Sequence, residues 1–454
     1  MIDVNLLGKY EWLADFQIPN TDDKISGIMK YNQEEGITLK LLIPGKIFKS
    51  YGDTKKQLKF DILYGANVEL GLFTLFNVKE LGYTSNFVYT NYSCSAEILI
   101  IGSLFADKEV IFDRLIFYAN DLESFCTHDT QLIEADHKAL FSTQMDGAEF
   151  KIGKMWMSSG SHNSHLYFSG DKANELKKDL ENLEKKYAEQ KTYIGNKDKI
   201  KLYFAYDKQG SYKDYFAFLY KINSLLSLLL LRPVYTLKAL FYHNDKIKTS
   251  DGKNTIDKSY QVLFSPFIHK QFCNLEKNNY FELLFHYKDF NNLEEIFTNY
   301  SKLTETKNII LKVLKNNIYR NNLSNVYERY IMLITALEAA YYQFGKKYNT
   351  KKYLDEVINL YAGERLITDI VRYLDCSKDK IGEELSSIRN YIVHYNNQNK
   401  KIKMFIESVE LCNLCEALFM VLVIATYEYL GFEQKLLKSL QCNYNQIGHY
   451  WSSD

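Results

Sequence analysis

Hydrophobic and polar residues follow two different periods along this chain of 454 residues. Alternation with period two, which is typical of half-buried strands, recurs at Ile37–Leu41, Phe60–Tyr64 and Ile200–Phe204. The runs Phe87–Phe105 and Glu109–Tyr118 are rich in the β-branched and aromatic residues that strands favour. We therefore predict a mainly β region from the first residue to about residue 205, folded as a sandwich or a partly closed barrel.

Two helical patterns interrupt or follow this β region. Asp171–Ile194 is highly charged and carries one narrow apolar seam, which predicts an amphipathic helix on the β domain or a short coiled coil. Tyr212–Leu231 is more apolar and predicts a more buried helix. Strand-like runs return at Val234–Tyr242 and Tyr260–Ile268, so the β-rich region extends beyond these helices.

The pattern changes to helical periodicity from about Asn292 onward. All four prolines lie in the first 266 residues, and only five glycines follow them, as expected for helices separated by C-caps. We predict an α+β protein with a β-rich N-terminal domain over residues 1–290 and an all-α C-terminal domain over residues 291–454. The clearest predicted helices are Leu323–Phe344, Tyr353–Ala362, Glu364–Leu374, Lys378–Asn396 and Met404–Leu430.

One apolar run, Leu411–Phe432, is about long enough to cross a membrane. It carries Asn413, Glu416 and Glu428, which are costly in hydrocarbon, so we predict a buried bundle helix and no membrane association. The N-terminus has no basic segment followed by an apolar one, and the seven cysteines are scattered as in a reducing cytosol. We expect a cytoplasmic protein.

Charge and motifs exclude several classes of protein. The 56 Lys and Arg balance 56 Asp and Glu, so nucleic acid cannot be bound through bulk positive charge, and any contact must be local. The chain lacks a Walker loop, a dinucleotide glycine fingerprint, H-E-x-x-H and G-x-S-x-G, and we expect no cofactor. A metal hydrolase remains an open alternative, and its metal ligands would come from His128, His137, His162 and His165. We expect instead that these residues lie in a polar loop and at a sheet edge.

The segment Leu385–Tyr395 combines an apolar stripe with three polar groups that can do chemistry. On a helix, Arg389, Asn390 and His394 lie off the stripe, and the last two are one turn apart. Val393 also lies on the outward side. This face is either an ordinary solvated surface or half of a site that a partner completes. The stripe consists of Ile381, Leu385, Ile388, Ile392 and Tyr395.

These residues carry a resemblance to a known family. Arg389 to His394 match the R-N-x-x-x-H form of the R-x4-6-H motif of HEPN domains, on a late helix of an all-α C-terminal domain. The segment Glu328–Ala340, with its Leu-Glu-Ala turn, resembles the early HEPN helix of ApeA-like proteins. The N-terminal part is similar to the ApeA N-terminal domain at Gly8 with Trp12, at Gly27–Leu41 and at Leu231–Val234.

The resemblance implies a metal-independent endoribonuclease of bacterial anti-phage, abortive-infection defence. Arg389, Asn390 and His394 would be catalytic, and Glu338 would support them, although a plain surface or interhelical role is the simpler interpretation of Glu338. The substrate would be RNA, such as tRNA, cleaved by 2′-OH attack at a composite site in a homodimer or larger oligomer of the C-terminal bundle. A phage-derived trigger would act on the N-terminal domain. The alternative is a non-catalytic HEPN-like module that binds RNA or a nucleotide, or that serves in dimerisation.

Overall fold

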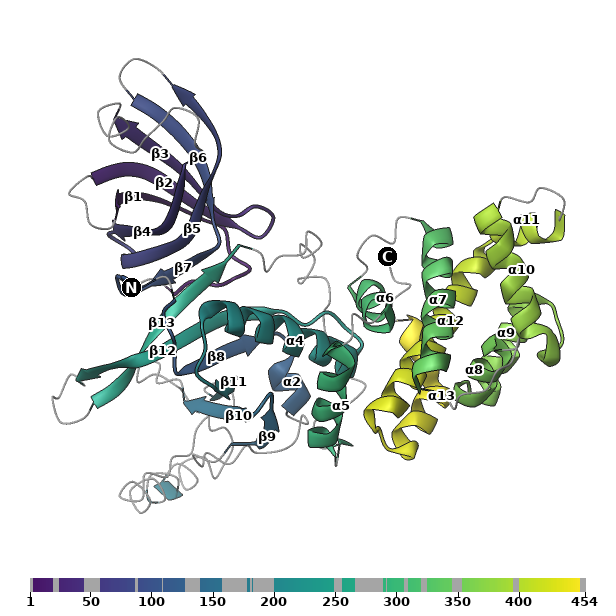
Figure 1. Ribbon diagram of the computed structural model, residues 1–454. Helices are drawn as coiled ribbons and strands as arrows, with labels where there is room; N and C mark the ends of the chain where they lie inside the picture. Colours follow the sequence, from purple (N-terminus) through teal and green to yellow (C-terminus); the bar gives the residue numbers. More distant parts are fainter. Residues whose placement is uncertain are drawn as a thin grey trace. The chain divides into compact units, whose positions relative to one another are not determined.

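The computed structural model divides into two compact units, and the predicted α+β class is confirmed (Figure 1). The first unit comprises Met1–Leu219 and Tyr235–Ile268, and the second comprises Tyr220–Val234 and His269–Asp454. The structure describes residues 3–18, 24–44, 58–85, 89–107, 109–126, 139–156, 178–179, 182, 200–248, 255–265, 289–290, 292–305, 309–319, 325–344, 353–394 and 400–449.

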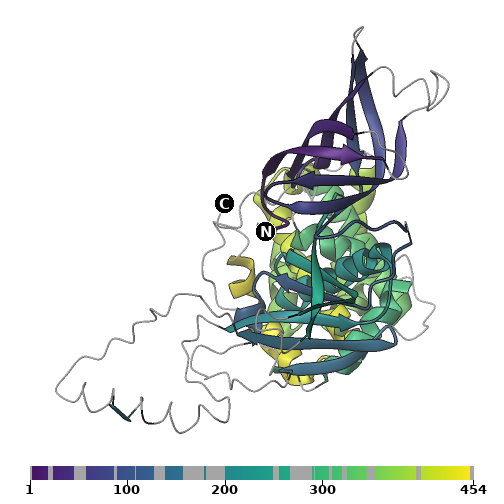
Figure 2. The ribbon, with the colours of Figure 1, turned by 90° about the vertical axis from the view of Figure 1, so that its left-hand side faces the viewer.

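Six antiparallel strands of the first unit close into a barrel, visible as the purple to blue strands in Figure 2. The predicted period-two alternation is evident in β1, where every second residue from Trp12 onward is buried inside the barrel. Since β4 pairs with both β1 and β5, the ring has no free edge. In pairing order the strands are β1 (Tyr10–Gln17), β2 (Lys24–Asn32), β3 (Gly36–Pro44), β6 (Tyr89–Ala96), β5 (Gly71–Ser85) and β4 (Lys59–Asn67).

A second run of strands extends from β5 and is also antiparallel. One face of it packs against the first turns of helix α4 (Tyr212–Leu230), where the rings of Phe218 and Tyr206 stack at 3.6 Å. The helix α2 (Leu122–Cys126) is short. In pairing order the strands are β7 (Ile98–Ile101), β13 (Thr255–Phe264), β12 (Thr236–Lys248), β8 (Arg114–Ala119), β11 (Ile200–Asp207), β10 (Ala148–Trp156) and β9 (Phe141–Met145).

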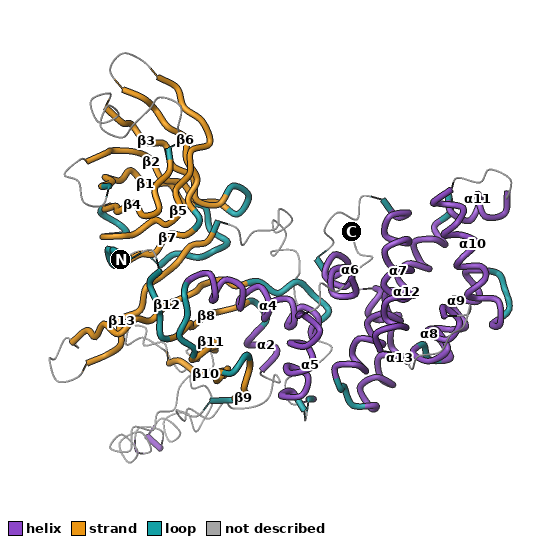
Figure 3. The backbone as a smooth tube through the Cα atoms, viewed as in Figure 1, coloured by secondary structure: helices purple, strands orange, loops and turns teal. Residues whose placement is uncertain are grey.

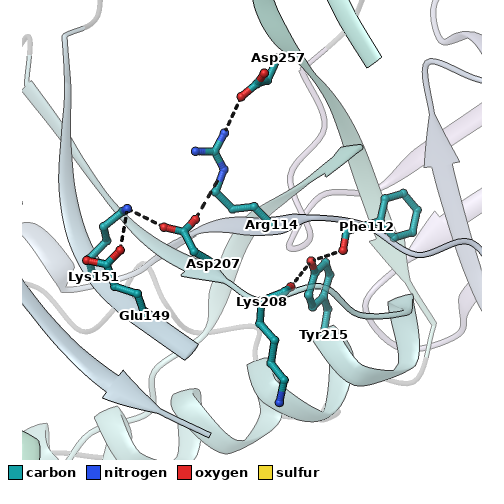
Figure 4. A network of polar contacts seen from close by, with 8 residues as sticks. All are labelled: Phe112, Arg114, Glu149, Lys151, Asp207, Lys208, Tyr215 and Asp257. Atoms are coloured by element: carbon teal, nitrogen blue, oxygen red, sulfur yellow. Dashed lines mark hydrogen bonds and ion pairs between the residues drawn. The ribbon is translucent and has the colours of Figure 1, made fainter. Parts of the chain in front are cut away.

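The opposite face of this sheet carries a ladder of charged side chains (Figure 4). The Arg114 guanidinium lies 3.3 Å from Asp257 Oδ2 and 4.4 Å from the centre of the Tyr242 ring. On the other side of Arg114, Asp207 Oδ2 lies 2.5 Å from the ammonium group of Lys151. Because these cations face carboxylates, the ladder stabilises strand register and offers no positive patch for a polyanion such as RNA.

The second unit is helical throughout its described residues (Figure 3). Helix α12 (Val409–Leu430) runs through the core of this unit. This helix is long and apolar enough to cross a membrane, but 72% of its most apolar window is buried inside the structure, as expected of a bundle core. The helices are α5 (Leu293–Glu305), α6 (Ile309–Ile318), α7 (Val326–Phe344), α8 (Tyr353–Tyr361), α9 (Glu364–Leu374), the 3-10 turn η4 (Lys378–Lys380), α10 (Ile381–His394), α11 (Lys400–Ile406), α12 (Val409–Leu430) and α13 (Gln434–His449).

One predicted helix, Met404–Leu430, is wrong as a single element. Helix α11 ends at Ile406, and a second helix, α12, begins at Val409. Ser408 caps α12 by accepting a hydrogen bond from the Glu410 amide at 3.2 Å. A serine hydroxyl satisfies an amide at a helix start, and this local preference was missed within an apolar pattern. The seam of the predicted helix Asp171–Ile194 lies outside the described residues.

Candidate active site

Helix α10 is held in the bundle by its apolar stripe. Ile381, Leu385 and Ile388 are buried as predicted. The fourth buried side chain is Tyr391, whereas Ile392 is only partly buried, so the stripe turns slightly from the predicted line. This packing fixes which side chains of the helix face outward.

Two polar contacts fix the position of α10 against its neighbours. The Gly382 amide donates to Asp355 Oδ1 on α8 at 2.7 Å, and the Tyr330 hydroxyl on α7 donates to the Leu385 carbonyl oxygen at 2.8 Å. A Cβ atom on residue 382 would lie 2.7 Å from Asp355 Oδ2, so only glycine allows this approach. The last turns of α10 are thus presented from a fixed base.

The predicted catalytic residues occupy this last part of α10. Asn390 and His394 are exposed, one turn apart, as the helical pattern predicted. Arg389 differs from the prediction of an outward side chain, because it is half-buried and its guanidinium lies near the hydroxyl of Tyr353, whose pKa it lowers. The reason is that a neighbouring helix supplies a partner, which periodicity within one helix cannot reveal.

Tyr353, the first residue of α8, is a member of this cluster that sequence analysis missed. Burial raises the pKa of its hydroxyl, the Glu338 carboxylate raises it further, and the Arg389 guanidinium lowers it. The structure therefore brings Glu338, on α7, and Arg389, on α10, around one hydroxyl group. With 37 tyrosines in the chain, no spacing distinguishes this one.

Few potential metal ligands lie near this cluster. The sequence from Arg389 to Lys403 contains no Asp or Glu. In the part of the chain that the structure describes, no three His, Cys, Asp or Glu side chains are grouped to hold a metal ion. The alternative metal ligands His128, His137, His162 and His165 lie outside the described residues.

Fold and site together define a class: a β-rich protein with a helical bundle that presents Arg, Asn and His from one anchored helix. The family described as ApeA N-terminal domain 1 matches residues 11–300, and the family described as Apea-like HEPN matches residues 242–436. The chain therefore belongs to the ApeA-like family and carries a C-terminal HEPN domain, as its sequence motifs predicted. No curated protein and no solved structure matches the chain.

Proposed function

We propose that this protein is a metal-independent endoribonuclease of anti-phage defence, and that α10 carries its catalytic residues. The observation that supports this most directly is the arrangement on α10, which presents exposed Asn390 and His394 together with a half-buried Arg389 near Tyr353. An exposed imidazole and a guanidinium on one helix suit attack on a phosphodiester. The family itself is one of defence-related HEPN proteins.

Each residue has a chemical role in cleavage. RNA contains its own nucleophile, the 2′-OH, so the protein has to move protons and stabilise charge on the phosphate. His394 takes the proton of the 2′-OH, since imidazole exchanges protons near neutral pH. Arg389 presents a planar donor fork to the nonbridging phosphate oxygens, and Asn390 orients the imidazole or bonds a substrate oxygen.

Tyr353 and Glu338 act through Arg389 in this scheme. An arginine side chain has several rotatable bonds, and the nearby half-buried hydroxyl of Tyr353 restricts the orientations of the Arg389 guanidinium. Glu338 acts on the same hydroxyl and supports the site without contacting substrate. We assign both as positioning residues.

The complete site requires a second copy of the chain. One motif supplies one imidazole, whereas 2′-OH attack uses a base for the nucleophile and an acid for the leaving 5′-oxygen. A two-fold homodimer of the C-terminal bundle brings two copies of α10 to one cleft. Val393, on the outward side of α10, is 53% exposed and becomes buried in such a dimer. RNA, such as tRNA, is the substrate in the cytoplasm, and a phage-derived trigger acts on the N-terminal domain.

The test compares total RNA from cells expressing wild type or His394→Ala, with and without phage infection, and purified proteins on labelled single-stranded RNA. We expect cleavage by wild type and none by the variant. Wild-type protein that binds RNA and leaves it intact under all these conditions would instead support a non-catalytic HEPN-like binding module.

A further inference from the structure

An exposed tyrosine stands at the edge of the proposed active site. The side chain of Tyr342 is 66% exposed, more than any other aromatic side chain in the described part of the chain. It lies on α7 one turn after Glu338, so the two residues share one face of the helix. The hydroxyl of Tyr342 and the Arg389 guanidinium both act on the hydroxyl of Tyr353. Tyr342 and Tyr353 also pack on the same ring, that of Tyr341, so Tyr342 lies in the neighbourhood of the proposed site.

The ring of Tyr342 packs against the ring of its neighbour Tyr341. Tyr341 is buried, and its hydroxyl bonds Glu356 Oε2 at 2.8 Å. Its ring lies 5.4 Å from that of Tyr342 at 76°, and 6.4 Å from that of Tyr353. Edge-to-face packing of this kind restrains the position of the Tyr342 ring, which stays largely exposed to solvent.

We propose that Tyr342 is a nucleobase subsite: a base of single-stranded RNA stacks on its exposed face while the adjoining phosphate lies on Arg389. This inference rests on the proposed ribonuclease function. A nucleotide carries its base and phosphate on one sugar, so a residue that binds the phosphate leaves the base beside it. An exposed aromatic ring at that place accepts any base, because every base has a π-face.

The surroundings of Tyr342 favour a base over a second protein chain as the occupant. Its helix neighbours Glu338 and Gln343 are polar, whereas the centres of protein interfaces are mostly apolar. Unpaired, splayed bases are the usual targets of aromatic side chains in RNA recognition. The subsite thus favours single-stranded RNA over a duplex, whose bases are already stacked.

Binding can be measured without cleavage in a His394→Ala background, with an end-labelled single-stranded RNA followed by fluorescence anisotropy. We expect Tyr342→Phe in this background to retain affinity within about twofold, because the ring remains, and Tyr342→Ala to weaken binding about tenfold. The salt dependence should be the same for both, since no charge is lost. A matched control is Leu360→Ala, which removes another exposed side chain, on α8, and should not change affinity.

The outcomes separate the two proposals. Unchanged affinity of Tyr342→Ala, where the parent binds RNA, overturns the subsite alone. A shift of Tyr342→Ala toward smaller species in sedimentation also overturns it, because the ring then belongs to an interface between copies. A parent protein that binds no RNA overturns the proposed function as well.

Discussion

The guanidinium of Arg389 lies near the hydroxyl of Tyr353 and lowers its pKa, and this proximity links the motif helix α10 to the start of α8. The carboxylate of Glu338, from α7, acts on the same hydroxyl. Three helices thus meet at one phenol. The positioning role that we propose for Tyr353 depends on this arrangement, although Tyr353 is outside the R-N-x-x-x-H motif.

Removing only the hydroxyl tests this relationship. Tyr353→Phe keeps the ring and its packing on Tyr341, so the melting temperature should change little. We expect kcat to fall roughly tenfold or more, because a loosely held guanidinium stabilises the transition state less well. In an Arg389→Lys background the same change should cost almost nothing, since residues that act as a unit are not additive. Additive losses in this double-mutant cycle would mean that Tyr353 acts independently of Arg389.

The motif residues should be separable from the fold. His394→Ala removes an exposed side chain and should change the free energy of unfolding by about 0.5 kcal/mol or less. Arg389→Ala loses the interaction with Tyr353 and should cost about 1 kcal/mol. Both variants should lack ribonuclease activity, measured on labelled RNA beside urea unfolding curves.

The matched control is Ile388→Asp, on the buried side of the same helix. It places a carboxylate in the core without a partner and should destabilise the bundle by about 3 kcal/mol or more. If Arg389→Ala or His394→Ala proved as unstable as this control, the side chain would be structural and its catalytic assignment would be wrong.

Local periodicity predicted most elements of this fold, because a strand or helix expresses its buried face in its own residues. The strands β3, β4 and β11 and the helices α7, α8 and α9 lie where alternation or helical spacing placed them. Closure of the barrel could not be predicted in the same way. It depends on β5, whose 15 residues pair with three different strands, and such long-range pairing leaves no local pattern.

The candidate site could likewise be predicted only where local spacing decides it. Spacing on one helix predicted that Asn390 and His394 face outward, and both are exposed. It could not predict the proximity of Arg389 to Tyr353, because the two residues come from different helices. The catalytic roles themselves remain predictions, which the cleavage experiments with EDTA, a deoxy substrate and mixed dimers test.

A half-buried lysine should make stability depend on pH. The Nζ atom of Lys315, on α6, lies 3.4 Å from the centre of the Tyr220 ring, and burial lowers the pKa of its ammonium to about 7. In the unfolded chain a lysine has a pKa of about 10.4, so between these values the unfolded state binds the additional proton. The free energy of unfolding should therefore rise with pH across this window, by at most about 1.4 kcal/mol per pH unit, and level off below it.

Lys315→Met isolates this contribution, because methionine keeps an unbranched stem without the charge. Compared by urea unfolding at about pH 7.5 and about pH 9, wild type should gain more stability than the variant, which should already be the more stable protein at the lower pH. Equal pH dependence in the two proteins would show that Lys315 is solvated in its charged form.

Cleavage should survive EDTA and leave a 2′,3′-cyclic phosphate, or the 3′-phosphate formed from it, opposite a 5′-hydroxyl. Because the sequence from Arg389 to Lys403 contains no Asp or Glu that could hold Mg²⁺, we expect the nucleophile to be the adjacent 2′-OH. A substrate with one 2′-deoxy nucleotide at the cut site should resist cleavage there and remain sensitive elsewhere. Cleavage of the deoxy position, or activity that EDTA abolishes and Mg²⁺ restores, would move the search to another site.

The composite site leads to a prediction about mixed dimers. Arg389→Ala dimers lack both guanidinium groups and His394→Ala dimers lack both imidazoles, so each protein alone should be inactive. When the two variants are co-expressed with different affinity tags, a doubly purified heterodimer has one Arg389 and one His394 facing a single cleft. We expect this heterodimer to cleave RNA at least about tenfold faster than either homodimer, although more slowly than wild type, which supplies a second imidazole as acid.

The dimer contact itself can be broken on the same helix. Val393→Glu adds a charge on the exposed side of α10, so it should leave the fold intact. In a two-fold interface the two introduced carboxylates face each other while losing water, which should shift the protein to monomers in sedimentation and abolish cleavage. A Val393→Glu protein that sediments as a monomer and retains full activity would show that one copy of α10 suffices. In the mixed-dimer experiment, an inactive heterodimer would show that Arg389 and His394 must come from the same chain.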